Sequence, residues 1–445
     1  MSLELRRLDT ENPEFDDELA RLTGVDLGDG GAIDGIANDI IDDVRARGDA
    51  ALVDYTNKFD DVACSSMAEL VFDVADLESA YVKLAETERQ ALEHAAARID
   101  AYHQYQRRQG VQNAWDFEDA DGNRLGQRVT ALDRVGVYVP GGQAAYPSTV
   151  LMTIIPAQVA GVREIVVTTP TPGGVHNALV MAALHLTGVT EGYAVGGAQA
   201  IAALAYGTET VRRVDKIVGP GGAFVAAAKR RVYGAVGIDV IAGPSEILIV
   251  TDGTAPVDWL VYDLFSQAEH DALAQSLLLC PDADYLDAVA ERVAEILDEQ
   301  KRTSIIAKSL ADRGALIHTR SLDEAIEIAN RVAPEHLELA VADPETLLAK
   351  VQHAGAIFLG IHSAEVMGDY AAGPSHVLPT YGTARFASPL GVYDFQKRSS
   401  VIGLSAAGSE SLARTASVLA RGEGLEAHAR AAEARIKGLD HNDKG

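Results

Sequence analysis

Four side chains of this sequence are of types that bind a divalent metal ion through nitrogen and oxygen atoms. Gln267 and His270 lie three residues apart, and two such residues share one face of a helix. Asp369 and His428 lie far along the chain and could complete the ligand set. Such ligands suit Zn²⁺ and also Mn²⁺, Co²⁺ or Ni²⁺. A histidine at a helix end is also a favourable charge near the helix dipole, so the spacing leaves both interpretations open.

A second group of side chains could move protons. Glu335 and His336 are adjacent, between a helix expected to end near Arg331 and a strand-like run. Because loops at the carboxyl side of parallel α/β sheets carry chemistry, we expect the pair in such a loop, and a plain solvated turn is the alternative. His376 lies in the Gly- and Pro-rich segment 372–380, where it could touch a substrate or only pack.

Glycine-rich turns follow three of the expected strands, in segments 135–142, 195–200 and 218–222. Glycines at such turns let a ligand approach the backbone, and the start of a following helix favours anions. The latter two turns lack the G-x-G-x-x-G fingerprint of dinucleotide sites, so tight turns without a ligand are the alternative. Ser245 lies in a further turn, Gly243–Glu246, and could cap it or contact a polar substrate.

The elements that position these residues alternate along the chain. Short apolar runs predict strands at 165–169, 193–195, 215–218, 246–250, 276–279, 316–318 and 356–359, with Ala-rich helical stretches between them. Strands separated by helices predict parallel α/β sheets, and continuous apolar runs fit strands covered on both faces. Helical spacing dominates residues 30–109 and the last fifty residues, where a helical arm could grip a second subunit.

Length and composition describe a globular chain of several domains. The 445 residues exceed one ordinary core and suggest roughly two to four domains. No apolar run is long enough to span a membrane and the first residues hold no apolar signal region, so we expect a cytoplasmic protein without a membrane partner. The only cysteines, Cys64 and Cys280, exclude a disulfide framework and a cysteine-based metal cluster.

The charge is strongly acidic. A net charge of −27 comes from 65 acidic and 38 basic residues spread along the chain, and lysine is scarce, with 10 lysines against 28 arginines. A dispersed acidic surface keeps a protein hydrated and soluble in high salt. This pattern favours a salt-loving source over the alternative, an acidic surface for a partner. Under either interpretation nucleic acid is a poor partner.

Seven segments in their order along most of the chain resemble the landmarks of the histidinol dehydrogenase family. They are Tyr138–Gly142, Gly243–Glu246, Ser266–His270, Pro334–Leu337, Gly368–Tyr370, Ser375–Gly382 and Asp394–Arg398. Each segment is modest evidence, and together they are highly specific. That family oxidises L-histidinol to L-histidine through L-histidinal, with two NAD and one Zn²⁺ per site. The resemblance therefore implies the last step of histidine biosynthesis.

The resemblance also implies roles for single residues. The implied metal ligands are Gln267, His270, Asp369 and His428, and the implied acid/base pair is Glu335 and His336. The implied substrate contacts are Ser245, Gln267, His270, His336, Asp369, His376, Glu423 and His428. The implied NAD contacts are Tyr138, Gln199 and the position of Gly222. In this family His428 and Glu423 would come from the partner subunit of a homodimer, so that two subunits share each site.

One position departs from the family pattern. Gly222 stands where the family usually has an asparagine that contacts NAD, so that contact must be lost or replaced. We therefore expect the change to affect cofactor affinity more than chemistry.

The resemblance further implies a fold of two Rossmann-like parallel α/β domains with helical arms at both ends. The expected organisation is an N-terminal arm at 1–24, a metal-binding catalytic domain at 25–137 with 246–385, an inserted NAD-contacting domain at 138–245, and a helical dimerisation arm at 386–445.

Two rival functions are consistent with parts of the sequence. One is a dehydrogenase of the same fold that oxidises another amino alcohol or a sulfonated alcohol. His376 and Glu423, which would read an imidazole, argue against it. The other is a two-domain binding protein that closes on a small ligand. That function leaves the adjacent Glu335 and His336 without a purpose.

Overall fold

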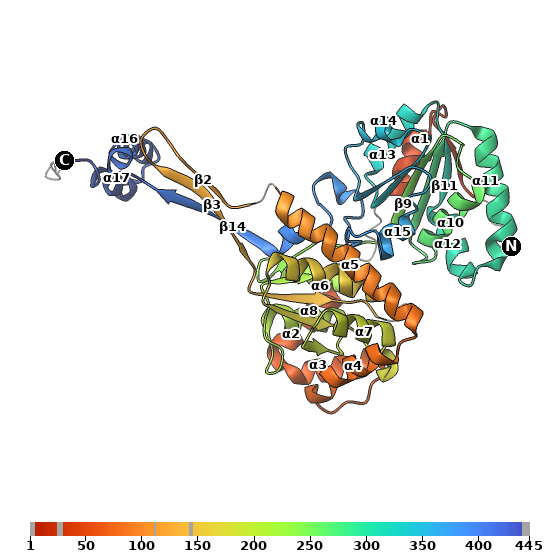
Figure 1. The fold of residues 1–445 in the computed structure, drawn as a ribbon, viewed down its shortest axis with the longest axis horizontal. Helices are drawn as coiled ribbons and strands as arrows, with labels where there is room; N and C mark the ends of the chain where they lie inside the picture. Colours follow the sequence, from red (N-terminus) through yellow and green to blue (C-terminus); the bar gives the residue numbers. More distant parts are fainter. Residues whose placement is uncertain (1–4, 25–29, 111–112, 142–145, 438–445) are drawn as a thin grey trace. The chain divides into compact units, whose positions relative to one another are not determined.

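The computed structural model describes residues 5–24, 30–110, 113–141 and 146–437 of the chain. The chain divides into two compact units, Met1–Arg107 with Leu132–Phe395 and Arg108–Ala131 with Gln396–Gly445. The first unit contains two parallel sheets and the second an antiparallel sheet (Figure 1). The predicted α/β fold class is confirmed.

A six-stranded parallel sheet forms one half of the first unit. Its strand order is β1-β11-β10-β9-β12-β13. The strands are β1 (Arg7–Asp9), β9 (Glu246–Thr251), β10 (Gln275–Cys280), β11 (Ala315–His318), β12 (His336–Ala340) and β13 (Ala356–Leu359). The predicted runs in this region all form strands. The expected N-terminal arm differs in one respect, because its residues 7–9 pair with β11 as an edge strand.

Helices cover both faces of this sheet, which is why its strands are apolar throughout. Ile247 and Ile249 of β9 belong to a core with α10, α11 and α12, whereas Leu248 and Val250 belong to a core with α1 and α13. The helices are α1 (Phe15–Thr23), α10 (Val257–Ala268), α11 (Ala283–Ile296), α12 (Thr303–Arg313), α13 (Leu322–Val332), α14 (Pro344–Leu348) and α15 (Glu365–Tyr370).

A five-stranded parallel sheet forms the other half of the first unit. Its strand order is β6-β5-β4-β7-β8. The strands are β4 (Arg134–Tyr138), β5 (Glu164–Thr168), β6 (Glu191–Tyr193), β7 (Lys216–Val218) and β8 (Gly237–Ile238). The surrounding helices are α2 (Gly30–Arg47), α3 (Asp49–Asp60), α4 (Val74–Lys83), α5 (Glu86–Gln109), α6 (Pro147–Ala160), α7 (Ala178–Leu186), α8 (Gly197–Tyr206) and α9 (Ala223–Val232).

Helices α2, α3 and α4 pack with this second sheet. α2 contacts α8 and α9, and α4 contacts α7. Their buried side chains share one core with β4 and β5. The sequence analysis grouped residues 25–137 with the metal-binding sheet, so the observed packing of α2 to α4 differs from that grouping. The helical periodicity of these segments shows that they have an apolar face, but not which sheet that face covers.

The second unit combines an antiparallel sheet with two helices. Its strand order is β14-β3-β2, with β2 (Trp115–Glu118), β3 (Arg124–Ala131) and β14 (Gln396–Gly403). Helices α16 (Ala406–Gly422) and α17 (Glu426–Glu433) pack on each other. The expected C-terminal arm is helical at these positions. The expectation of a helix is wrong for residues 396–403, which form β14 because they pair with β3.

Short 3₁₀ helices connect these elements. They are η1 (Met67–Leu70), η2 (Pro172–Gly174), η3 (Leu297–Glu299), η4 (Thr383–Arg385) and η5 (Val392–Phe395). None of the helices in the described ranges combines the length and the apolar character needed to cross a bilayer.

Candidate active site

The predicted acid/base pair, Glu335 and His336, lies at the amino end of β12, next to the amino end of the neighbouring strand β9. His336 is the first residue of β12, and Glu246 is the first residue of the adjacent strand β9. The expectation of a loop at the carboxyl side of the sheet is therefore wrong for Glu335 and His336. The reason is local: Glu335 follows the end of α13 and its chain then enters the strand, so the helix-to-strand connection returns to the amino edge.

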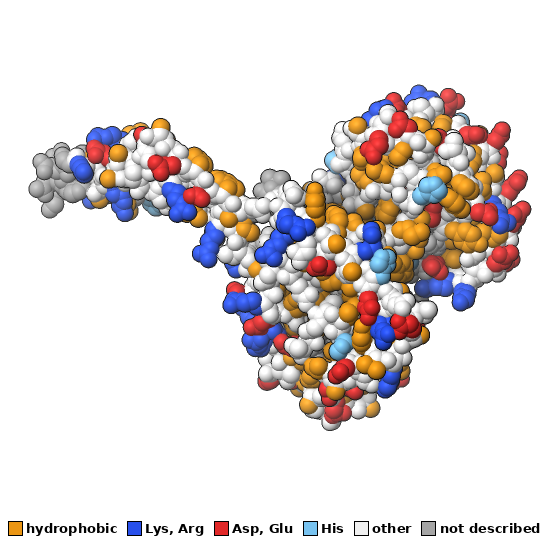
Figure 2. All heavy atoms as spheres, viewed as in Figure 1, with side chains coloured by type: hydrophobic (Ala, Val, Ile, Leu, Met, Phe, Trp, Pro, Cys, Tyr) orange, Lys and Arg blue, Asp and Glu red, His pale blue; other side chains and the backbone are white. Residues whose placement is uncertain are grey.

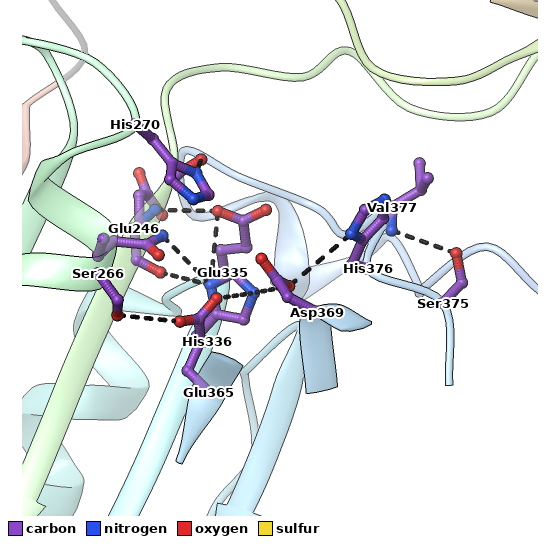
Figure 3. A network of polar contacts seen from close by, with 12 residues as sticks. Glu246, Ser266, His270, Glu335, His336, Glu365, Asp369, Ser375, His376 and Val377 are labelled. Atoms are coloured by element: carbon purple, nitrogen blue, oxygen red, sulfur yellow. Dashed lines mark hydrogen bonds and ion pairs between the residues drawn. The ribbon is translucent and has the colours of Figure 1, made fainter. Parts of the chain in front are cut away.

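The ring of His336 is buried and oriented by the backbone (Figure 3). Its Nδ1 lies 2.9 Å from the carbonyl oxygen of Glu246 and donates a hydrogen bond to it. Its Nε2 lies 3.7 Å from Asp369 Oδ1 and 3.8 Å from Glu365 Oε1. The ring thus keeps one nitrogen fixed and turns the other toward two carboxyl groups.

These charges set the protonation of the ring. Burial by itself lowers the pKa of His336, but the negative charge of Glu335 and the nearby carboxylate of Asp369 outweigh it and raise that pKa to about 10. Burial opposes ionisation of Asp369, but the nearby imidazole of His336 holds the pKa of this carboxyl group well below the usual range. His336 and Asp369 therefore favour each other's charged form.

Glu335 is a buried carboxyl group held by its neighbour strand. Its Oε2 accepts a hydrogen bond from the backbone nitrogen of Glu246 at 2.9 Å and lies 3.7 Å from His336 Nδ1. Burial raises the pKa of Glu335 to about 8 and that of Glu246 to about 7. A carboxylate with a raised pKa is a stronger base than a solvated one, which suits removal of a proton from water.

The predicted metal ligands of the first unit come together around this pair. Gln267 is fully buried in the last turn of α10, and its Oε1 has no hydrogen-bond partner among the described residues. His270 follows that helix, and its Nδ1 lies 3.2 Å from Ser245 Oγ. Asp369 Oδ1 lies 3.9 Å from His376 Nδ1. Five of the predicted site residues are thus neighbours of the His336 ring or of one another.

His376 connects the site to the second sheet of the same unit. Its Nε2 is hydrogen-bonded to Thr149 Oγ1 at 3.0 Å, and Thr149 lies in the first turn of α6. Its backbone nitrogen contacts Met152 Sδ at 3.3 Å, and the neighbouring Ser375 donates to the Met152 carbonyl at 3.2 Å. Burial lowers the pKa of the His376 imidazole, which favours a neutral ring that can hydrogen-bond a substrate.

Two acidic residues of the site were not predicted. Glu365 is buried and belongs, with His336 and Asp369, to a group whose ligand atoms lie within 4.8 Å of one another. It precedes Asp369 by four residues on α15, so helical spacing from the predicted ligand could have identified it. Glu246 ends the Gly243–Glu246 segment, in which the sequence analysis predicted a role for Ser245 only.

The predicted NAD contacts lie at the carboxyl edge of the five-stranded sheet. Tyr138 ends β4, and its hydroxyl accepts a hydrogen bond from the backbone nitrogen of Gly197 at 3.1 Å. Gln199 is buried in the first turn of α8, and its Oε1 has no partner among the described residues. Gly222 is the N-cap of α9. Gly142 of the predicted turn lies outside the described residues.

Two predicted residues lie in the second unit. His428 is in α17 and Glu423 follows α16. The structure describes the two units separately, so the position of these residues relative to Asp369 stays a prediction.

Known proteins resemble this chain over nearly its whole length. A sequence model of histidinol dehydrogenase matches residues 29–436. The chain belongs to the histidinol dehydrogenase family. The curated histidinol dehydrogenase of Cupriavidus pinatubonensis is 56% identical over 436 residues, covering 98% of each chain. The crystal structure of histidinol dehydrogenase from Elizabethkingia anophelis matches with a TM-score of 0.88 and 33% identity, covering 98% of each chain. The chain is accordingly an NAD-dependent oxidoreductase of this family.

A more distant likeness concerns the fold alone. Aldehyde dehydrogenase 21 from Physcomitrella patens matches with a TM-score of 0.50 and 11% identity. The chemistry of a cysteine nucleophile does not follow from this likeness. Cys64 and Cys280 are both buried, and burial raises the pKa of the Cys280 thiol to about 11. Only a thiolate is a good nucleophile, and burial keeps a thiol in its protonated form. Neither cysteine is therefore set up to attack an aldehyde.

Proposed function

We propose that the chain oxidises L-histidinol to L-histidine through L-histidinal, using two NAD and one Zn²⁺ per site, as the last step of histidine biosynthesis. The observation that carries the proposal is the buried group of Glu335, His336, Gln267 and Asp369, which combines proton-transfer groups with metal-ligand atoms in one place. The substrate is inferred from family membership, and the proton-transfer and metal-binding roles are inferred from this buried group.

The side chains fit a divalent cation. Two buried oxygens of the site, Gln267 Oε1 and Glu365 Oε1, lack hydrogen-bond partners among the described residues. Gln267, His270 and Asp369 would hold the ion, with His428 of a partner subunit as the fourth ligand. Bound there, Zn²⁺ would hold the imidazole and amine of the substrate and, as a positive charge, lower the pKa of His336.

His336 is the group that takes the proton of the substrate hydroxyl in the alcohol step. Its Nδ1 is committed to the carbonyl of Glu246, so Nε2 is the atom that exchanges the proton. NAD supplies the hydride acceptor, because Zn²⁺ has no redox chemistry.

Glu335 acts in the aldehyde step. Its Oε2 is held by the backbone nitrogen of Glu246, which leaves Oε1 to remove a proton from the water that adds to the aldehyde. The hydrated aldehyde carries a hydroxyl again, so His336 can take a second proton in the same way once it has passed the first one to solvent. Burial of the site keeps the aldehyde from escaping between the two oxidations.

The five-stranded sheet would carry the cofactor and the six-stranded sheet the metal. Tyr138, Gln199 and the backbone at Gly222 are the proposed NAD contacts, and the unpaired buried oxygen of Gln199 is a group that a polar ligand would satisfy.

We further propose a homodimer in which His428 and Glu423 reach the partner's site. The second unit exposes large apolar side chains that a second copy could cover. They are Trp115, Phe117, Ile402, Leu404, Leu412, Val418, Leu419 and Leu425. The two unpaired cysteines fit a cytoplasmic enzyme, because that compartment keeps thiols reduced.

The test is NADH formation with limiting L-histidinol, measured with and without a chelator. We expect two NADH per histidinol, and no NADH from simple or sulfonated alcohols. The chelator should abolish the reaction, and added Zn²⁺ should restore it. No NADH from histidinol at any salt concentration would refute the proposal.

A further inference from the structure

A buried ion pair lies behind the glycine turn that follows β7. Lys229 and Asp239 form the pair, and both side chains are only 2% exposed. Lys229 comes from α9, two turns after Gly222, and Asp239 follows β8. Neither residue carries a role in the proposed chemistry. Burying two charges costs several kcal/mol each, so such a pair is weak evidence for stability and calls for another explanation.

The pair holds a single residue of the turn by both of its backbone groups. Lys229 Nζ donates to the carbonyl oxygen of Gly219 at 3.0 Å, and Asp239 Oδ2 accepts from the backbone nitrogen of Gly219 at 2.7 Å. The two side chains also bond to each other. The backbone of Gly219 is thus fixed from one side by charge-assisted hydrogen bonds, which are stronger than ordinary ones.

Gly219 in turn packs against the strand that bears Tyr138. Its φ is +113°, which favours glycine, and a Cβ at this position would lie 2.0 Å from the carbonyl oxygen of Tyr138. The turn and the end of β4 therefore touch backbone to backbone. A shift of Gly219 would move the 219–222 turn relative to Tyr138.

Gly222 itself offers no side chain to a ligand, and a Cβ added there would meet no atom within 4 Å. Because the turn is Gly219, Pro220, Gly221 and Gly222, any hydrogen bond that it makes with a cofactor must come from its backbone. Backbone contacts depend on the position of the turn, since no side chain can rotate to compensate for a displacement.

We propose that Lys229 and Asp239 are positioning residues for a nicotinamide dinucleotide: the buried pair fixes the 219–222 turn so that its backbone and Tyr138 present one rigid surface to the cofactor. This inference rests on the proposed function, because it assumes that the turn contacts NAD. It assigns the pair to cofactor affinity and not to proton transfer.

The test compares Lys229→Met and Asp239→Asn with the unchanged full-length chain. NAD binding is measured directly by titration calorimetry, and KM for NAD, KM for L-histidinol and kcat by NADH formation. We expect both variants to raise the Kd and the KM for NAD by about tenfold or more, with kcat and the KM for histidinol within about twofold.

Arg134→Met is the matched control. Arg134 is also a buried cation of the five-stranded sheet, but it pairs with Glu191 and Glu164 at the opposite end of β4 from Tyr138. The Arg134→Met variant should have a lower melting temperature than the unchanged chain and the same Kd for NAD. Asp239→Asn keeps the size of the side chain. If Lys229→Met does not fold, the Kd for NAD of the Asp239→Asn variant therefore tests the inference.

An unchanged Kd for NAD in a folded variant would overturn the inference, and so would a tenfold loss in the Arg134 control. Failure of the proposed function looks different: the unchanged chain itself would then form no NADH from histidinol.

Discussion

Glu335 and Glu246 share one buried corner of the site, where the backbone nitrogen of Glu246 donates to the Glu335 carboxyl group. Burial raises the pKa of both side chains toward neutrality. At the scale of single residues, the site thus combines one carboxyl group poised to change its protonation with a histidine whose ring is fixed by a carbonyl. The backbone nitrogen of Glu246 orients Glu335 and its carbonyl oxygen orients His336, so each group can be changed without removing the hydrogen bond that holds the other.

Replacing Glu335 by Gln separates these roles. The amide cannot remove a proton from water, so oxidation of L-histidinal should fall by about 10²–10⁴-fold, whereas oxidation of L-histidinol should fall far less. Single-turnover rates for each half-reaction, measured by NADH absorbance, give the comparison. Small and equal losses in both half-reactions would show that Glu335 only supports the fold of the site.

At the scale of elements, the ends of helices and strands position the chemistry. The amino ends of β9 and β12 carry Glu246 and His336, and the last turn of α10 carries Gln267. The N-cap of α9 is Gly222, which provides no side-chain hydrogen bond to that helix. Each of these positions lies at or beside an end of a helix or strand.

Replacing Gly222 by Asn should strengthen the cofactor contact at the start of α9. The backbone there has φ −66°, and no atom lies within 4 Å of an added Cβ, so the side chain fits without strain. An asparagine in place of glycine at an N-cap changes helix stability by only a few tenths of a kcal/mol. We therefore expect a severalfold lower KM for NAD with a melting temperature changed by less than about 2 °C. An unchanged KM would show that this position does not face the cofactor.

At the scale of the whole molecule, two properties extend beyond a single fold unit. One is the proposed sharing of sites between subunits through His428. The other is the acidic charge, which Figure 2 shows as Asp and Glu side chains scattered over the visible surface of the described residues and not gathered in one patch.

Subunit mixing tests the shared site. His270→Asn and His428→Asn should each be inactive and low in zinc. In a hybrid dimer one site combines an intact His270 with an intact partner His428, so random exchange should restore about a quarter of the activity. If exchange is demonstrated by mass and activity stays absent, His428 serves the site of its own subunit.

The acidic charge should make folding depend on salt. At 0.01 M salt the Debye length is about 30 Å, so repulsion among the excess acidic residues reaches across the protein, whereas at 1 M it is about 3 Å. Screening should therefore raise the melting temperature and strengthen subunit association. Thermal unfolding across a KCl series measures this. A midpoint that is flat or falls toward molar KCl would contradict salt adaptation and favour an acidic surface for a partner.

The sequence by itself determined the α/β class, most strands and several candidate residues of the site. Apolar runs and helical periodicity are local patterns, and side-chain chemistry is carried by each residue wherever it lies. With the resemblance to the histidinol dehydrogenase family, this was enough to predict Gln267, His270, Glu335, His336 and Asp369 as candidate site residues without knowing their positions in space.

Only the tertiary structure decided which distant segments meet. The pairing of β14 with β3 and of β1 with β11, the packing of α2 to α4 on the five-stranded sheet, and the place of the site at amino ends all depend on contacts between segments far apart in sequence. The same holds for Glu365 beside His336, and for Lys229 with Asp239 behind Gly219. Local periodicity shows that a face is apolar, and residue type shows that a side chain can ionise. The packing of the whole chain then decides which face or side chain each of them contacts.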